Sequence, residues 1–330
     1  MESEAKEMAR KHPDADSVRA ALALAVRAPS VHNTQPWQWR VGDTTVHLYA
    51  DESRRLPQAD PDGRDLLISC GAALHHFRVA ARSLGWETVV HRFPNPAEPT
   101  HLAAIEFTAT TPTDDVIEAA REINLRRTDR RRATSWEVPE ALLAKIVAAG
   151  TAEGALVSEV PGGSTRIRLV RAFQEAAQQH HIDPAYQAEL AAWSGRHAAE
   201  EGVPSRSTVA AADPLTREFH YPTLTEAVLH DLDVRGVLVL VHTSSDDPLS
   251  RLRAGEATSA VLLAATAIGL ATCPLTEPLE LPGTRALVGT DLLSGSGFPQ
   301  LLVRMGWAAT SAAQVPMSPR RALDDVVHRL

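Results

Sequence analysis

The sequence predicts a mixed α+β protein built from two similar lobes in one polypeptide. Its 330 residues leave room for two domains of ordinary size. Segments with helical and strand periodicity follow each other from residue 15 to the C-terminus. Two long helical segments with similar patterns of small residues also lie roughly half a chain apart, which is typical of one ancestral lobe used twice.

The first lobe is expected over residues 1–120. It begins with a helix at 15–27, which Asp16 or Ser17 can cap and which ends before Pro29. The next elements are two strands joined by a turn, a long helix and two further strands, at residues 38–42, 45–51, 64–87, 88–94 and 101–109.

The second lobe is expected over residues 121–330, after a basic connection at 111–135. Its elements are three helices, at 139–149, 163–180 and 247–271, and three strands, at 155–161, 236–243 and 298–308. Around residues 183–225 the periodicity decays into Gly, Pro, Ser and charged residues. An irregular segment of this length predicts either a functional lid or a surface excursion without a role.

The two long helices have matching ends. Each carries a glycine followed by alanines or other small residues, and each finishes in Leu-Gly or Ile-Gly before a strand. Because small side chains let a second helix approach closely, this face resembles the interface of a dimer.

Composition narrows the classes of partner and compartment. The formal net charge of -8 argues against a general nucleic-acid partner, because binding to a phosphate backbone requires a basic surface. The first 17 residues lack the apolar core of a signal peptide, and the longest apolar run, 257–273, is interrupted by polar residues. We therefore expect a cytoplasmic protein without a membrane span.

Cysteine usage gives no sign of a metal centre. Cys70 and Cys273 each lie in an apolar stretch, which favours reduced, buried thiols. No spacing of Cys and His resembles a zinc site, so we expect no metal.

The segment 28–37 is dense in neutral hydrogen-bonding groups between two prolines. Ser30, Asn33 and Gln35 offer donors and acceptors without charge. Such a loop suits the edge of a flat heteroaromatic ring or a polyhydroxy chain. A helix stop followed by an Asx-rich turn explains the same residues.

Two basic segments stand out from the acidic background. Residues 126–132 contain five arginines, a threonine and an aspartate, and Arg320 and Arg321 form a smaller pair near the C-terminus. Arginine forks and a hydroxyl match the oxygens of a phosphate group. A solvated basic linker is the alternative for the first of these segments.

Residues 273–278 follow the second long helix directly and contain two prolines. A loop bounded by prolines can hold its backbone N–H groups in a fixed direction. An ordinary helix-to-strand turn is the alternative.

Together and in this order, these four segments resemble the FMN-dependent nitroreductase superfamily. The resemblance implies that Arg126, Arg127, Thr128 and Arg130, with Arg320 and Arg321, hold the FMN phosphate. It implies that the flavin is bordered by Pro29, Ser30, His32, Asn33 and Gln35. It also places Pro274, Leu275, Thr276 and Glu277 along the ring, with a backbone N–H near Thr276 directed at flavin N5.

The segments 27–37, 60–71, 252–257 and 274–278 resemble one branch more closely, the Acg-like proteins of actinobacteria. That branch fuses two nitroreductase-like lobes into an intramolecular pseudo-dimer. Here the 28–37 loop and the 126–132 segment each occur once, so we expect one FMN site per chain and a monomer.

The resemblance implies an oxidoreductase in which NAD(P)H reduces the flavin, and the flavin reduces a small-molecule acceptor such as a nitroaromatic or a quinone. The alternative is a catalytically silent stress or dormancy protein that holds FMN under a closed lid. A structural protein without flavin is a third reading. The absence of a G-x-G-x-x-G pattern fits transient use of the nicotinamide, and it does not distinguish NADH from NADPH.

Overall fold

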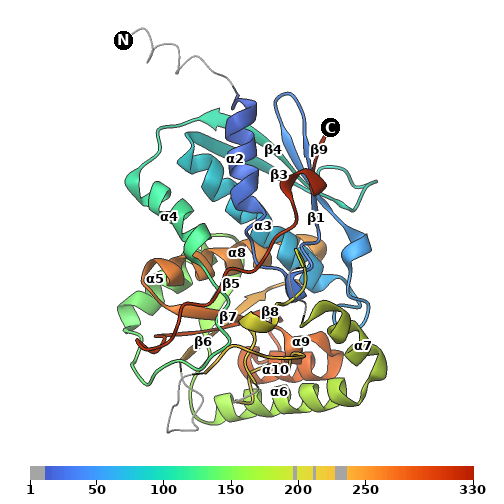
Figure 1. Ribbon diagram of the computed structural model, residues 1–330, viewed down its shortest axis with the longest axis vertical. Helices are drawn as coiled ribbons and strands as arrows, with labels where there is room; N and C mark the ends of the chain where they lie inside the picture. The colour runs from blue at the N-terminus through green and yellow to red at the C-terminus, as the bar shows by residue number, and fades with distance from the viewer. Residues whose placement is uncertain (1–11, 196–198, 211–212, 227–235) are drawn as a thin grey trace.

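The computed structural model describes residues 12–195, 199–210, 213–226 and 236–330. In this part of the chain two β-sheets, each with its own helices, meet along the helices α3 (Arg64–Ser83) and α8 (Pro248–Ala267) at the centre of the molecule (Figure 1). None of the described helices is long and apolar enough to cross a membrane.

The first sheet has the strand order β3-β4-β2-β1-β9. Its strands are β1 (Trp37–Val41), β2 (Val46–Ala50), β3 (Trp86–Arg92), β4 (His101–Ala109) and β9 (Val327–Arg329). Four of them come from the first third of the chain and run antiparallel to their neighbours. The fifth, β9, comes from the C-terminus and pairs in parallel with β1, so the chain ends in the sheet where it began.

The helices that accompany this sheet are α2 (Ala15–Ala25), α3 and α4 (Asp114–Leu125). The basic connection expected over 111–135 contains a helix in its first part, because α4 occupies 114–125. The apolar residues Val116, Ala120 and Ile123 are buried on one face at helical spacing, so the signal was present beneath the charge of the segment.

The second sheet has the order β5-β6-β8-β7, all antiparallel. Its strands are β5 (Leu156–Glu159), β6 (Val237–Thr243), β7 (Ala271–Leu275) and β8 (Phe298–Gly306). The accompanying helices are α5 (Glu140–Thr151), α6 (Ser164–Ile182), α7 (Pro184–Trp193), α8, α9 (Glu277–Glu280) and α10 (Pro282–Leu293). Sequence patterns missed α7, β7, α9 and α10.

The four strands of the second sheet correspond to four of the five strands of the first. Read from β7, the second sheet has the order β7-β8-β6-β5, which matches β3-β4-β2-β1 in the first. The helices α3 and α8 both have 20 residues and begin 184 positions apart. Each ends in a glycine with positive φ, +90° at Gly85 and +83° at Gly269, before the next strand.

At one point the helices α3 and α8 contact each other through their backbones. A Cβ atom on Gly71 would lie 2.0 Å from the carbonyl oxygen of Leu252, and one on Gly255 would lie 2.1 Å from that of Ile68. The contact is reciprocal, since 71 and 255, like 68 and 252, are separated by the same 184 positions. Only glycine allows the helices to cross this closely.

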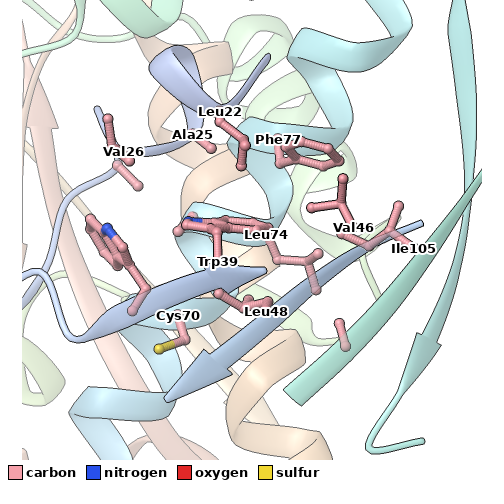
Figure 2. Packing of buried hydrophobic residues seen from close by; sticks show 14 of the residues in the cluster. Leu22, Ala25, Val26, Trp39, Val46, Leu48, Cys70, Leu74, Phe77 and Ile105 are labelled. Atoms are coloured by element: carbon pink, nitrogen blue, oxygen red, sulfur yellow. The ribbon is translucent and has the colours of Figure 1, made fainter. Parts of the chain in front are cut away.

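Apolar residues form separate cores around the two sheets. In the first, α2 and α3 cover β1 and β2, and Trp39 lies against Phe77 with ring centroids 5.2 Å apart (Figure 2). The second sheet has a core on each face, one shared with α5 and α8 and the other with α6 and α10. These cores fix the end of β7 opposite the first turns of α3, where the site described next is found.

Candidate functional site

A cavity lies between the first sheet with its helices and the second sheet with its helices, which we call the two halves of the molecule. It contains about 890 Å³ of empty space, part of it open to solvent. Its walls come from the 29–32 loop, the N-terminal half of α3, residues 128–130, the end of β7 and residues 215–219. Nine predicted residues line it: Pro29, Ser30, His32, Thr128, Arg130, Pro274, Leu275, Thr276 and Glu277.

The loop after α2 has an unusual backbone. His32, Asn33 and Gln35 have φ values of 45°, 55° and 53°, which non-glycine residues adopt rarely. Two hydrogen bonds hold this conformation, one from Gln35 N to Ser30 Oγ at 2.9 Å and one from Val31 N to Ser69 Oγ at 3.1 Å. The loop is therefore fixed against α3 with His32 in the cavity wall.

Asn33 and Gln35 are outside the set that lines the cavity. The Asn33 side chain donates to Gly202 O at 3.0 Å, and the Gln35 side chain donates to Glu200 O at 2.9 Å. Gln35 Oε1 also accepts from Arg321 N at 2.9 Å. These two amides connect the loop to the long insert and to the C-terminal tail.

The 126–132 segment divides into paired and unpaired arginines. Arg131 and Arg132 form ion pairs with Asp129 and Glu226 at 2.7 and 3.1 Å. Arg130 donates to Ser207 O at 2.9 Å, and its guanidinium lies 4.8 Å from the ring centre of Phe219. Burial lowers the pKa of Arg130.

Four further arginines gather beside the 29–32 and 128–130 walls of the cavity without lining it: Arg27, Arg126, Arg127 and Arg320. The pKa of each is lowered by burial, and in Arg126, where it falls to about 10, the positive charges of Arg127 and Arg27 add to the effect. Within the described ranges, no carboxylate forms an ion pair with any of the four. We call them the arginine cluster.

The arginine cluster adjoins the cavity through the chain itself. Arg126 stands two residues before Thr128, and Arg320 donates at 2.9 Å to the carbonyl of Ala28, which precedes Pro29. Arg126 is buried, yet its Nε and Nη1 atoms find no hydrogen-bond partner among the described residues. Buried, unpartnered donors beside uncompensated charges are the chemistry of an anion site.

The segment at the end of β7 is more regular than predicted. The expectation of a loop over 273–278 is wrong at 273–275, which belong to the strand β7 and pair with β8. Pro274 and Leu275 are its last residues, Thr276 is the N-cap of α9, and Glu277 opens that short helix. The end of a strand in a sheet, rather than a free loop, therefore holds this backbone against the cavity.

The long insert contributes side chains that sequence reasoning did not assign. Residues 184–193 form α7, and residues 196–198 and 211–212 of the predicted lid lie outside the described residues. Asp213 forms a buried ion pair with Arg304 at 2.8 Å, and Leu215 packs in the core of the second sheet. These contacts fix the start of the segment 213–219, which lines the cavity from one side.

Arg217 is the centre of a buried polar network in that segment. It donates to His32 Nε2 at 3.0 Å and to Thr276 Oγ1 at 3.3 Å, and it forms an ion pair with Glu280. Burial lowers the pKa of His32 to about 3, and the charge of Arg217 adds to this, so the imidazole is neutral. Tyr186 OH accepts a further hydrogen bond from Arg217.

Asp65, in the first turn of α3, is the second ionisable side chain in the cavity wall to which sequence reasoning assigned no role. Arg64 Nη2 lies 2.8 Å from Asp65 Oδ1, and both side chains are buried. Burial raises the pKa of Asp65 to about 8 even though Arg64 lowers it. The cavity therefore holds a carboxyl group that keeps its proton at neutral pH.

Residues 123–307 match the model of a family described as "Nitroreductase family". The chain is also 44% identical over 321 residues to "Putative NAD(P)H nitroreductase Rv3131" of Mycobacterium tuberculosis (strain ATCC 25618 / H37Rv), with 96% of this chain and 92% of the relative covered. This chain belongs to the nitroreductase family. The family match includes the 126–132 segment and the end of β7, and it excludes the 28–37 loop and the C-terminal arginines.

A second nitroreductase relative, "Putative NAD(P)H nitroreductase acg" of the same strain, is 39% identical over 327 residues, covering 95% of this chain and 96% of the relative. Among solved structures, an FMN-dependent nitroreductase, NfnB from Mycobacterium smegmatis in complex with NADPH, is similar at 18% identity and a TM-score of 0.42, covering 64% of this chain and 97% of that one. A nitroreductase with bound FMN from Bacteroides fragilis NCTC 9343 is similar at 16% identity and 0.38, covering 59% and 91%.

Proposed function

We propose that this nitroreductase binds one FMN in the cavity between its halves and transfers electrons from NAD(P)H to a small-molecule acceptor, such as a nitroaromatic or a quinone. The observation that carries the proposal is the arginine cluster beside the residues that line the cavity. It supplies buried, uncompensated positive charge and unpartnered donors where a phosphate would be held.

The donor set of the cavity fits the rest of the cofactor as well. In this proposal Arg126, Arg127 and Arg320 hold the phosphate with Thr128, while Arg321 pairs with Asp51 at 3.7 Å. Pro29, Ser30 and His32 border the ring from the first half, and the backbone around Thr276 approaches it from the second. Asn33 and Gln35 act indirectly, by holding the loop in place.

When bound, FMN would supply the hydride chemistry, accepting from NAD(P)H and donating to the acceptor. The protein's part is to position the groups and set their charge. Arg130 places a positive charge in the wall, which favours an anionic reduced ring. The insert residues Arg217 and Phe219 exclude water from one side of the cavity and limit which acceptors can enter.

The correspondence of the two sheets and the reciprocal crossing of α3 and α8 support a further part of the proposal. The chain is an intramolecular counterpart of a two-subunit assembly, with lobes dividing near residue 120 and with one cofactor site. Because the central interface is already formed within the chain, the protein is expected to be monomeric, which the molar mass in solution from light scattering would test.

The visible absorption spectrum of the purified protein, recorded before and after anaerobic NADPH or NADH, tests the proposed function. Flavin bands that bleach with either nicotinamide are expected. Bands that respond only to dithionite would favour the alternative, a protein that holds flavin under a closed insert. Absence of flavin bands after incubation with FMN would overturn the proposal.

A further inference from the structure

The offset of 184 residues locates the counterpart of the cavity in the other half of the molecule. Ala72 on α3 and Thr276 at the end of β7 both line the cavity. The residues 184 positions away are Glu256 on α8 and Arg92 at the end of β3. An equivalent site between the halves would therefore lie where Glu256 and Arg92 meet.

Charged side chains fill that place. Glu256 is completely buried. Arg92 donates two hydrogen bonds to its carboxylate, from Nε to Oε1 and from Nη2 to Oε2, both at 2.7 Å. Arg78 Nη1 lies 2.7 Å from Glu256 Oε2 and also pairs with Glu153. We call Arg78, Arg92, Glu153 and Glu256 the ion cluster; its two positive and two negative charges balance.

The surrounding elements match as well. In the cavity, the loop 26–36 between α2 and β1 reaches α3, where Val31 N bonds Ser69 Oγ. The counterpart connection between α5 and β5 has only residues 152–155. Its Gly154 lies against Arg253, the residue 184 positions after Ser69, and its Glu153 belongs to the ion cluster. The first half thus has the loop 26–36, part of which lines the cavity. At the equivalent place the second half has a short turn, whose Glu153 carboxylate belongs to the ion cluster.

The charges within the ion cluster stabilise one another in place. Burial would lower the pKa of Arg78, but Glu256 and Glu153 raise it above its usual value. Burial likewise acts to raise the pKa of Glu153, and His75 and Arg78 outweigh it, so the carboxylate stays ionised. A balanced cluster of this kind can occupy a buried space without a ligand, whereas a single unpaired charge could not.

We propose that the ion cluster occupies the second of two equivalent ligand sites between the halves and keeps it closed. This inference rests on the proposed function, because it takes flavin as the ligand of the first site. The chain then keeps one cavity because the residues that would line the other, at positions 92 and 256, have become an ion pair.

The test is an opened variant, Arg92→Thr/Glu256→Ala, which places at both positions the residues that line the first cavity and leaves Arg78 paired with Glu153. The FMN content of the wild-type chain is measured first. Riboflavin, which lacks the phosphate, is then titrated by equilibrium dialysis into FMN-saturated, monodisperse protein. We expect no riboflavin bound per wild-type chain and one per chain of the opened variant.

Equal riboflavin counts in the two proteins would overturn the inference, and so would two FMN per wild-type chain. A wild-type chain without FMN would instead contradict the proposed function. The inference would still be tested by comparing the riboflavin bound per chain in the wild type and in the opened variant. Arg82→Thr/Glu87→Ala removes an exposed ion pair between α3 and β3 and should leave both counts unchanged.

If the opened variant does not fold, a filled variant, Arg92→Met/Glu256→Leu, tests the inference in its place. Apolar side chains of similar volume can replace a buried ion pair without loss of stability. We expect this variant to fold, to bind FMN as the wild type does and to bind no riboflavin. Loss of FMN binding in it would show that the ion cluster serves the first site and would overturn the inference.

Discussion

At the scale of single residues, the site combines strained backbone with the arginine cluster, whose charges have no carboxylate partner among the described residues. The positive φ values at His32, Asn33 and Gln35 persist because Ser30, Ser69, the insert and the tail all hold the loop. Such strain is found where the surrounding structure overdetermines a local conformation, most often at functional sites. The loop also contacts the arginine cluster, because Asn33 Oδ1 accepts a hydrogen bond from Arg320 Nη1 at 2.9 Å.

Arg126 tests the anion site. The variant Arg126→Ala should weaken FMN binding by about 1.5–3 kcal/mol, the net value of a hydrogen bond to a charged group, which is roughly a 10- to 150-fold rise in Kd. Fluorescence titration of the apoprotein would measure it. Arg132→Ala changes an arginine of the same segment that is paired with Glu226 and should have little effect. Equal affinities of Arg126→Ala and wild type would remove Arg126 from the site.

Asp65 makes stability depend on pH. Its pKa is raised to about 8 in the folded chain, against 3.8 for an ordinary aspartate. Between these values the folded state keeps a proton that the unfolded state has lost, so the free energy of unfolding falls as pH rises, by up to about 1.4 kcal/mol per pH unit. Asp65→Asn removes this effect and should gain stability relative to wild type from pH 4 to 8. Urea unfolding at several pH values would check it, and a constant difference would contradict it.

The residues of the site could be predicted only in part from the sequence. Pro29, Ser30, His32, Thr128, Arg130 and the 274–277 segment were found because each lies in a short, compositionally unusual run. Arg217 and Asp65 were not assigned, because nothing local marks Arg217 and the resemblance of the 60–71 segment gave no role to Asp65 itself. Arg217 acquires its role from His32 and Glu280, residues 185 and 63 positions away, which only the folded chain brings together.

At the scale of elements, the crossing of α3 and α8 depends on two glycines. Gly71→Ala or Gly255→Ala would place a Cβ about 2 Å from a backbone carbonyl oxygen, so the helices must separate. We expect each variant to lose about 1–3 kcal/mol of stability, as overpacked interiors do. Gly283→Ala on α10 meets no atom within 4 Å and should be neutral or slightly stabilising. Thermal unfolding of the three variants would test the comparison, and equal losses would contradict it.

Arg217 holds the insert segment 213–219 in the cavity wall. Removing it alone would leave the buried carboxylate of Glu280 without its charge partner, at a cost of about 3–5 kcal/mol. The double variant Arg217→Met/Glu280→Gln avoids that cost. We expect faster amide hydrogen exchange in 213–219 and faster NAD(P)H oxidation, because the segment no longer closes the cavity firmly. Unchanged exchange and an unchanged rate would show that the segment is not a lid.

Long periodic elements were predictable, and short ones were not. The helix α3 and the strands β4 and β8 carry enough apolar residues at one period to be recognised. The strand β7 follows α8 after only a few residues and contains Pro274, so its pattern merged with the helix before it. The helix α7 presents only Tyr186 and Leu190 to the interior, which is too few for a periodic signal.

At the scale of the whole molecule, the tail ties the last residues to the first sheet. Arg320 donates to the carbonyl oxygens of Val26, Arg27 and Ala28 at the end of α2, and β9 extends the sheet beside β1. Together with the α3–α8 crossing, these contacts couple the halves. The division of the chain into two lobes near residue 120 stays a prediction, because β9 of the C-terminal tail lies in the first sheet.

Deleting residues 326–330 should therefore lower Tm without splitting the transition. The deletion removes the β9 pairing and the buried Val326, but the α3–α8 interface still makes the halves unfold together. Differential scanning calorimetry should show one transition at lower temperature. Two separate transitions would mean that the halves are independently stable.

The parallel pairing of β9 with β1 also has a consequence for synthesis on the ribosome. The strand β1 is finished at Val41, whereas its partner begins at Val327. At about 5–20 residues per second, roughly a quarter of a minute to a minute of translation separates the two strands. Throughout that interval one edge of the nascent first sheet carries unpaired N–H and C=O groups, which can pair with the strands of other chains.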